Sequence, residues 1–223
     1  MEKTNSKSCF GIIIKKSNIL VIGGTGFLGS NLVGGLERQG HNIRVLSRGN
    51  VRDLVNYQNV EYIVGDINNN EDLDKSINGM DYVYHLASTT NPKSSENDLI
   101  FDVSTNLSSS INILKGCVKN NIKKFIFCSS GGTVYGNHNK MPISENFKCE
   151  PISSYGLVKY NIELYIKYFN YKYNLDYEIL RLSNPYGKKQ FPGGSQGVIP
   201  TFIKNILNDN EIKVFGDGSS IRA

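Results

Sequence analysis

Cysteine and histidine are scarce in this sequence. Its 223 residues include four cysteines and three histidines. No two cysteines form a Cys-x-x-Cys pair, and no histidine stands at the spacing from a cysteine that metal sites use. The pattern disfavours a structural zinc site and a disulfide framework, and it indicates reduced thiols in a reducing compartment. We therefore expect no bound metal.

Long apolar stretches and clusters of like charge are absent as well. The N-terminal patch 10–14 covers five residues, fewer than a signal peptide or a membrane span needs, and no later window comes closer. The formal net charge of +5 comes from scattered basic residues, such as Lys15-Lys16 and Lys123-Lys124. We expect a cytoplasmic protein that binds small anionic ligands, not nucleic acid or a membrane, with residues 1–17 as a loose leader.

Short apolar runs alternate with segments of helical periodicity along most of the chain. Strands are predicted at 18–22, 43–46, 60–64, 82–86, 124–128 and 177–180, and helices at 27–39, near 73–77, at 97–120 and at 155–173. Strands that alternate with helices and are apolar on both faces form a parallel sheet covered on two sides. The predicted fold class is therefore α/β, a Rossmann-like doubly wound parallel sheet over residues 18–180. Its ligands should lie at the carboxyl ends of the strands.

The alternation weakens after Leu180. One helix at 196–208 and one strand at 212–215 are predicted there. Because these elements are too few to make a compact domain alone, residues 181–223 are interpreted as the beginning of a smaller C-terminal substrate lobe.

A glycine-rich turn joins the first predicted strand to the first predicted helix. Gly23, Gly26 and Gly29 stand at Gly-x-x-Gly-x-x-Gly spacing. Glycine permits a tight turn and lets the backbone approach a pyrophosphate, whose charge is met by amides at a helix N-terminus. Strand, turn and helix together indicate a dinucleotide-binding turn. The expected cofactor contacts in it are Gly23, Gly26, Phe27, Leu28 and Gly29.

The ends of the second and third predicted strands should also contact the cofactor. The second ends in Ser47-Arg48, where a chain that binds NAD in this way usually carries an acid. An arginine there can pair with the 2′-phosphate of NADP, which favours NADP over NAD. The alternative is a solvated surface arginine, with the cofactor chosen elsewhere. Asp66, followed by Ile67, is interpreted either as an adenine contact or as a helix N-cap.

Several further motifs follow one another along the chain. They are Gly23–Ser30, His85-Leu86-Ala87-Ser88, Asn106, Ser129–Gly136, Tyr155-Gly156-Leu157-Val158-Lys159, Arg181–Gly187 and Phe215–Gly218. Together they resemble the extended short-chain dehydrogenase/reductases of the NAD-dependent epimerase/dehydratase family, in particular the UDP-glucose 4-epimerase branch. The resemblance implies a nucleotide-sugar 4-epimerase that holds NAD or NADP tightly and oxidises C4 transiently. The cofactor contacts that it implies are Leu86, Ala87, Ser88, Asn106, Ser129, Tyr155, Lys159 and Pro185.

Two Tyr-x-x-x-Lys patterns occur, Tyr155 with Lys159 and Tyr168 with Lys172. Tyr155 starts a helix after the serine-bearing fifth strand, as the family requires, whereas Tyr168 lies well inside that helix. On a helix Tyr155 and Lys159 share one face. The lysine cation and the positive nicotinamide should lower the pKa of the phenol. The resemblance makes Tyr155 the base that removes the sugar hydroxyl proton, and Lys159 a ligand of the nicotinamide ribose.

The Val-Tyr-Gly motif departs from the family at one position. The family usually places Ser or Thr three residues before the valine, and this chain has Gly131 there. Ser129, Ser130 or Thr133 could supply the hydroxyl, with Ser130 the first choice and Thr133 the second. Sugar 4,6-dehydratases of the superfamily carry Asp-Glu after their catalytic Thr, whereas this chain has Gly132 and Thr133, so a dehydratase is disfavoured. A nucleotide-sugar reductase or dehydrogenase would use the same residues and stays the alternative reaction.

The resemblance also assigns the substrate end of the site. Asn184 and Arg222 match residues that bind the phosphates of a sugar nucleotide, and Ser130 would contact the sugar. The family motif continues beyond this arginine, so we interpret the chain as C-terminally truncated, which leaves a non-catalytic NAD(P)-binding protein as a second alternative. By resemblance we also expect a homodimer formed through helices 97–120 and 155–173, and a role in polysaccharide biosynthesis.

Overall fold

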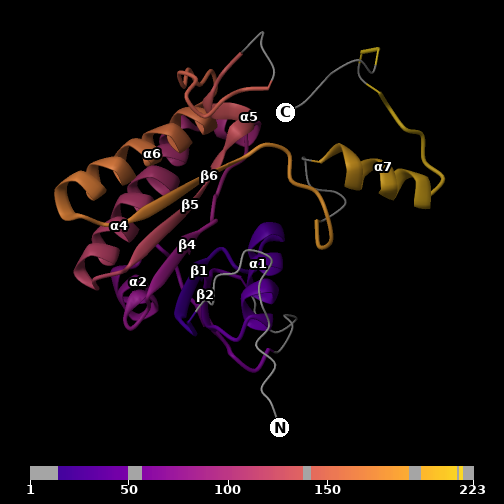
Figure 1. The fold of residues 1–223 in the computed structure, drawn as a ribbon. Coiled ribbons are helices and arrows are strands. Elements are labelled where there is room, and N and C mark those ends of the chain that lie inside the picture. The colour runs from indigo at the N-terminus through magenta and orange to yellow at the C-terminus, as the bar shows by residue number, and fades with distance from the viewer. Residues whose placement is uncertain (1–14, 50–56, 138–141, 191–196, 215, 218–223) are drawn as a thin grey trace.

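Six parallel strands form one sheet in the computed structural model, which describes residues 15–49, 57–137, 142–190, 197–214 and 216–217. The strands are β1 (Asn18–Ile22), β2 (Asn42–Ser47), β3 (Val60–Val64), β4 (Tyr82–His85), β5 (Lys124–Ser130) and β6 (Tyr177–Leu182). Their order is β3-β2-β1-β4-β5-β6, and each neighbouring pair is parallel (Figure 1). This order leaves a crevice where it reverses, at the carboxyl ends of β1 and β4. The predicted Rossmann-like α/β fold is confirmed.

Helices connect the strands. They are α1 (Phe27–Arg38), α2 (Asn70–Ile77), the 3-10 helix η1 (Ser94–Glu96), α3 (Leu99–Asp102), the π-helical segment η2 (Val103–Ser108), α4 (Ser109–Lys119), α5 (Gly131–Val134), α6 (Ser154–Tyr173) and α7 (Val198–Leu207). The helix predicted at 97–120 therefore starts two residues later and contains a π-helical turn, which hydrophobic periodicity does not reveal. Helix α5 was not predicted, because the pair Gly131-Gly132 is a poor helix former.

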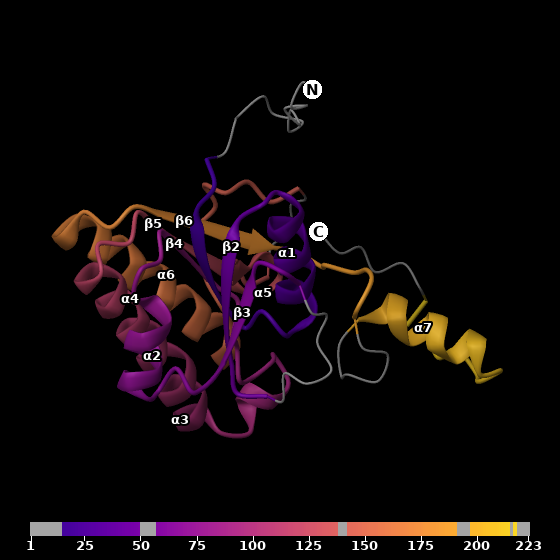
Figure 2. The same ribbon diagram turned by 90° about the horizontal axis from the view of Figure 1, so that it is seen from below.

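The two faces of the sheet are covered unequally. Helices α2, α4 and α6 pack on one face around the buried Phe125 and Phe127, and α1 packs on the other face against Val21 (Figures 1 and 2). The outer strands keep exposed apolar side chains, with Val64 of β3 60% exposed and Leu180 of β6 40% exposed. Helices thus cover both faces of the central strands, as expected, and α1 is the one helix on the second face in the described part of the chain.

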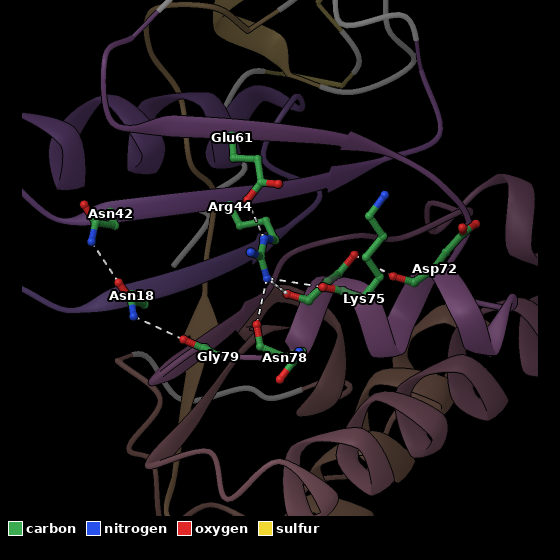
Figure 3. Close-up of polar contacts among 9 residues, drawn as sticks. Asn18, Asn42, Arg44, Glu61, Asp72, Lys75, Asn78 and Gly79 are labelled. Carbon is green, nitrogen blue, oxygen red and sulfur yellow. Dashed lines mark hydrogen bonds and ion pairs between the residues drawn. The ribbon is translucent and has the colours of Figure 1, made fainter.

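Arg44 ties β2 to α2 (Figure 3). Its Nη1 donates to three carbonyl oxygens at the C-terminal end of that helix, those of Lys75 (3.2 Å), Ser76 (3.0 Å) and Asn78 (2.9 Å). Its Nε pairs with the Glu61 carboxylate on β3 at 2.7 Å. The last carbonyls of a helix lack intrahelical partners and carry partial negative charge, so a cation there is stabilising. The contact holds α2 beside β2 and β3.

The segment after β6 leaves the sheet. Helix α7 stands apart from the other helices in both views (Figures 1 and 2), and none of its residues is buried. The strand predicted at 212–215 is wrong over its described part, because residues 212–214 are not in a strand. A strand needs a neighbour for its backbone hydrogen bonds, and this segment runs away from the sheet edge.

Two kinds of feature were not found among the described residues. None of their helices combines the length and the apolar character that crossing a membrane requires. No group of three or more His, Cys, Asp or Glu side chains in the described ranges is arranged to hold a metal ion. The cytoplasmic location stays a prediction from the sequence.

Candidate active site

A cavity of about 330 Å³ opens at the carboxyl ends of β1, β2, β3 and β4. In a sheet of this order, ligands bind at that crevice. The expected cofactor contacts that line it are Gly23, Gly26, Ser47, Arg48, Asp66, Ile67, Leu86, Ala87, Ser88 and Asn106. The turns after four strands thus meet around one space, which suits an extended ligand such as a dinucleotide.

The glycine turn fits a pyrophosphate. Gly23 has a φ of +84°, and a Cβ on it would lie 2.7 Å from the backbone nitrogen of Ala87. At Gly26 the space is open, because a Cβ would meet only the Gly23 carbonyl oxygen, at 3.5 Å. Gly26 is also the N-cap of α1, with no side-chain cap and no acid in the first turn. No side chain therefore competes for the first amides of α1, which can bind an anion.

Phe27, Leu28 and Gly29 form the first turn of α1 and do not line the cavity. A Cβ at Gly29 would collide with the carbonyl oxygen of Gly23. This glycine therefore permits the close packing of helix on turn, the role that the third glycine has in dinucleotide-binding turns. Cofactor contacts of Phe27 and Leu28 stay a prediction.

The end of β2 carries a hydroxyl pair beside the cavity. Ser47 Oγ lies 2.9 Å from Thr25 Oγ1, and it accepts the backbone N–H of Gly49 at 3.3 Å. Arg48 is exposed where it borders the cavity. The site thus offers hydroxyls and an arginine where an acid is usual for NAD.

Asp66 follows β3 and faces the same cavity. Its Oδ1 accepts from the backbone N–H and from Nδ2 of Asn68, at 2.9 and 3.0 Å. The N-cap of α2 is Asn69, whose side chain accepts from the amides of Glu71 and Asp72. The interpretation of Asp66 as a helix N-cap is therefore wrong, and its role as an adenine contact stays a prediction.

Asn106 closes the cavity from η2. It is buried, its Oδ1 accepts the backbone N–H of Thr89 at 2.9 Å, and its Nδ2 donates to Asp102 Oδ1 at 2.9 Å and Thr90 Oγ1 at 3.1 Å. With both ends of its amide engaged, Asn106 holds the turn after β4 against the helical segment.

Tyr155 and Lys159 lie on one face of α6, as expected. Lys159 is buried, its Nζ donates to the Cys128 carbonyl oxygen at 3.1 Å, and it stands over the rings of Phe127 at 4.8 Å and Tyr155 at 5.6 Å. Burial lowers the pKa of Lys159 to about 8, against opposing effects of Cys128 and Asp102. The ammonium is thus held between two aromatic rings under the end of β5.

The pKa of Tyr155 differs from the expectation. Burial raises it to about 12, and the nearby Cys128 and Asp102 act in the same direction. The sequence predicted that Lys159 and a positive nicotinamide together would lower this pKa. In the protein without nicotinamide, desolvation of the phenolate outweighs the lysine, whose proton is directed to a carbonyl oxygen. The joint effect of Lys159 and a bound nicotinamide stays a prediction.

The second pattern, Tyr168 with Lys172, has similar geometry in a different environment. Lys172 Nζ also lies 5.6 Å from the ring of its tyrosine. Both residues are exposed, with Tyr168 46% exposed. Water then screens the lysine charge, so the electrostatic interaction within this pair is weaker than one made by a buried lysine.

The Ser129 side chain belongs to a buried ionic network and does not line the cavity. Its Oγ donates to Glu163 Oε1 at 2.5 Å, and Glu163 is 0% exposed. Arg181 binds the same carboxylate with Nε (3.1 Å to Oε1) and Nη2 (2.6 Å to Oε2), and its Nη1 donates to the Tyr135 hydroxyl at 2.8 Å. Glu163 raises the pKa of Arg181 above its ordinary value. The network joins β5, β6 and α6 next to Ser130, which follows Ser129 in the chain.

The position of the unusual glycine explains why it carries no hydroxyl. A Cβ at Gly131 would lie 2.9 Å from the Arg181 carbonyl oxygen, so a side chain does not fit beside β6. Thr133 Oγ1 is buried and has no hydrogen-bond partner among the described residues. Ser130 is half-buried at the N-cap of α5, and its side chain makes no capping bond. Of the two candidates chosen from the sequence, Ser130 is the accessible one.

Residues 19–223 match the model of the NAD dependent epimerase/dehydratase family. The chain belongs to this family. Three solved structures show the likeness. A UDP-N-acetylglucosamine 4-epimerase from Methanobrevibacter ruminantium, in complex with UDP-N-acetylmuramic acid, is 35% identical with a TM-score of 0.87, covering 94% of this chain and 68% of that chain. A UDP-glucose 4-epimerase from Thermotoga maritima with UDP-glucose is 37% identical with a TM-score of 0.85, covering 92% and 68%. A UDP-glucose 4-epimerase from Thermus thermophilus in complex with NAD is 29% identical with a TM-score of 0.83, covering 92% and 69%.

The substrate end of this epimerase/dehydratase chain is more open than its cofactor end. Asn184 and Pro185 follow β6 and are exposed. Arg222 lies outside the described residues. The segment beyond Pro185 returns towards α1, where Asn31 Nδ2 donates to the Lys188 carbonyl oxygen at 2.8 Å. The predicted phosphate contacts of Asn184 and Arg222 stay predictions.

Two acids of the site were missed from the sequence. Asp102 and Glu163 are both 0% exposed, whereas single acids on amphipathic helices are usually solvated. Glu163 had a signal, because it follows Lys159 by one helical turn and lies on the apolar face with Ile162 and Ile166. Asp102 stands four residues before Asn106, and no pattern in the sequence distinguishes it.

Proposed function

We propose that this member of the family is a nucleotide-sugar 4-epimerase acting on a UDP-hexose, with NAD held in the cavity at the ends of β1–β4. The observation that carries the proposal is the pair of half-buried Tyr155 and buried Lys159 on α6, linked through Ser154, Asp102 and Asn106 to the wall of that cavity. The names of the similar solved structures support the substrate class. The family description and the NAD complex of the Thermus relative support NAD, and the lean towards NADP from Arg48 has no further support.

The residues of this chain would divide the work as follows. NAD held by the residues that line the cavity would supply reversible hydride-transfer chemistry. Tyr155 would take the proton of the sugar hydroxyl and give it back, and the buried cation of Lys159 would stabilise the phenolate formed in that step. Ser130 would donate a hydrogen bond to the reacting oxygen. The hydride and the proton would both stay in the site and return to the sugar. This suits epimerisation, which has no net redox change.

Turnover by the purified chain tests the proposal. We expect released NAD in mass spectrometry, and C4-epimerised product from UDP-glucose or UDP-N-acetylglucosamine. Tyr155→Phe should abolish turnover and leave NAD bound, because only the exchanged proton is lost. Tyr168→Phe is the matched control, since it makes the same change in an exposed pair on the same helix, and it should keep full turnover.

Other outcomes would change the assignment. Unchanged turnover in Tyr155→Phe would reject the catalytic role of Tyr155. Net oxidation or reduction of the sugar with stoichiometric NAD(P)H change would favour the reductase alternative. Bound cofactor with no turnover on any nucleotide sugar would favour the non-catalytic alternative.

We further propose that two copies of the chain pair through α3–α4 and α6. Exposed apolar side chains support this, among them Ile100 (79% exposed) and Phe101 on α3, and Tyr165 and Tyr171 on α6. Exposed apolar side chains on two neighbouring helices can mark an interface. Sedimentation should give a dimer for the wild type and a monomer for the double variant Ile100→Lys, Tyr165→Lys. A wild-type monomer at assay concentrations would contradict the prediction.

A further inference from the structure

Asp102 is a buried carboxylate at the end of α3, 0% exposed. It accepts three hydrogen bonds from neutral donors: Thr90 Oγ1 at 2.7 Å and Asn106 Nδ2 at 2.9 Å on its Oδ1, and Ser154 Oγ at 2.8 Å on its Oδ2. Burying a carboxylate is unfavourable by several kcal/mol unless its oxygens are well bonded. Asp102 is therefore expected to have a function that depends on its charge or its hydrogen bonds, which an apolar residue could not provide.

The three donors come from three separate parts of the site. Thr90 belongs to the turn after β4, Asn106 lines the cofactor cavity, and Ser154 is the first residue of α6, directly before Tyr155. The start of α6 is further fixed by η1, where Ser95 Oγ accepts the backbone N–H of Tyr155 at 3.2 Å. Asp102 is therefore the single side chain, among the described residues, that bonds both the cavity wall and the beginning of the catalytic helix.

We propose that Asp102 is a positioning residue that fixes Tyr155 relative to the cofactor cavity. The proposal rests on the proposed function for the part that concerns turnover. Asp102 acts through Asn106 and Ser154 and does not touch the reacting atoms.

The charge of Asp102 also reaches the catalytic pair. The titratable groups that act on Tyr155 in the described structure are Lys159 on its own helix, Cys128 on β5 and Asp102 on α3; His85 on β4 faces Lys159. Asp102 raises the pKa of both Tyr155 and Lys159. Removing this charge should therefore move the titration of Tyr155 to lower pH, which a purely structural contact would not do.

Two substitutions separate the charge from the anchor. Asp102→Asn removes the charge and keeps an oxygen for Thr90 and Asn106, whereas Asp102→Ala removes both. Asp98→Asn is the matched control, because Asp98 is an exposed acid that caps the same helix, and asparagine caps equally well. Tyrosine labelled with ¹³C on its Cζ reports each phenol by NMR, and the Tyr155 signal is identified by its loss in Tyr155→Phe. NAD affinity is measured by calorimetry, and epimerisation by product analysis.

We expect the Tyr155 signal of Asp102→Asn to titrate at lower pH than in the wild type, with NAD affinity retained. In Asp102→Ala, kcat should fall about tenfold or more with little change in the sugar KM, since misplacement of a reacting group by about 1 Å is that costly. The proposal is overturned if the Tyr155 titration in Asp102→Asn matches that in Asp98→Asn. If Asp102→Ala does not fold, the Asp102→Asn titration alone decides. A wild type without turnover overturns the proposed function, and the titration still decides the link between Asp102 and Tyr155.

Discussion

His85, at the end of β4, makes the stability of this fold depend on pH. The imidazole is buried between Phe125 and Phe127, its Nε2 lies 2.9 Å from Ser110 Oγ, and its Nδ1 has no hydrogen-bond partner among the described residues. Burial lowers the pKa of His85 to about 3 from an ordinary 6.5, and the charge of Lys159 adds to the effect. A proton on this ring would place an uncompensated cation in the core.

The direction of the effect follows from proton binding. Folded His85 stays neutral down to about pH 3, whereas the unfolded chain binds a proton near pH 6.5. Between these values the unfolded state binds more protons, so the free energy of unfolding decreases as the pH falls. Above pH 6.5 neutral His85 makes its full contribution to the free energy of unfolding. Between pH 7 and pH 5, His85 alone should remove about 2 kcal/mol from the free energy of unfolding.

The perturbation is His85→Gln, which keeps a polar group for Ser110 and cannot be protonated. Urea unfolding at pH 7 and at pH 5 gives, for each protein, the decrease in the free energy of unfolding between these two pH values. The loss should be about 2 kcal/mol smaller in His85→Gln than in the wild type. His41→Gln removes the other histidine that is buried among the described residues, and burial lowers the pKa of His41 as well. This variant measures the separate share of position 41 in the pH dependence. Equal losses in the wild type and His85→Gln would show that His85 does not cause the pH dependence.

Two further predictions concern the network behind Ser130 and the glycine turn. Glu163→Ala should lower the free energy of unfolding by about 3–5 kcal/mol, because it leaves the Arg181 cation without its carboxylate partner. The double change Glu163→Leu, Arg181→Met removes both charges and should cost much less. Urea unfolding measures both variants, and an equal cost for both would contradict the ionic account. Gly29→Ala should abolish NAD binding in calorimetry, because the Cβ would collide with the Gly23 carbonyl oxygen. Gly35→Ala in the same helix has open space, so it should bind NAD normally and gain roughly 0.5–1 kcal/mol of stability; normal NAD binding by both variants would refute the packing role of Gly29.

The sheet could be predicted from the sequence because its signals are local. Runs such as 18–22 and 124–128 are short, apolar and followed by turn residues, and a parallel α/β sheet leaves little freedom in how such strands are connected. The segment 212–215 has a similar composition, yet its described residues form no strand. A strand depends on a neighbour elsewhere in the chain, and composition carries no information about that neighbour.

The candidate site could be predicted where its function requires particular residue types at fixed spacing within one short segment. The glycine turn and the Tyr155–Lys159 pair meet that condition, and the structure brings the turn to a cavity and buries the lysine. The hydrogen bond from Ser129 to Glu163 could not be predicted, because the two residues are 34 positions apart. Asp102 was missed for the same reason, since its bond to Ser154 spans 52 positions. Long-range pairing of polar groups decides these roles.

The close approach of Gly131 to β6 limits how this active site can be redesigned or can evolve. Restoring the family's usual hydroxyl by Gly131→Ser would push the Cβ against the carbonyl oxygen of Arg181, the residue that also holds Glu163. The substitution would therefore strain the strand that anchors the ionic network, and it could succeed only with a compensating shift of β6. A side chain at position 131 therefore requires the backbone of β6 at Arg181 to move away from α5.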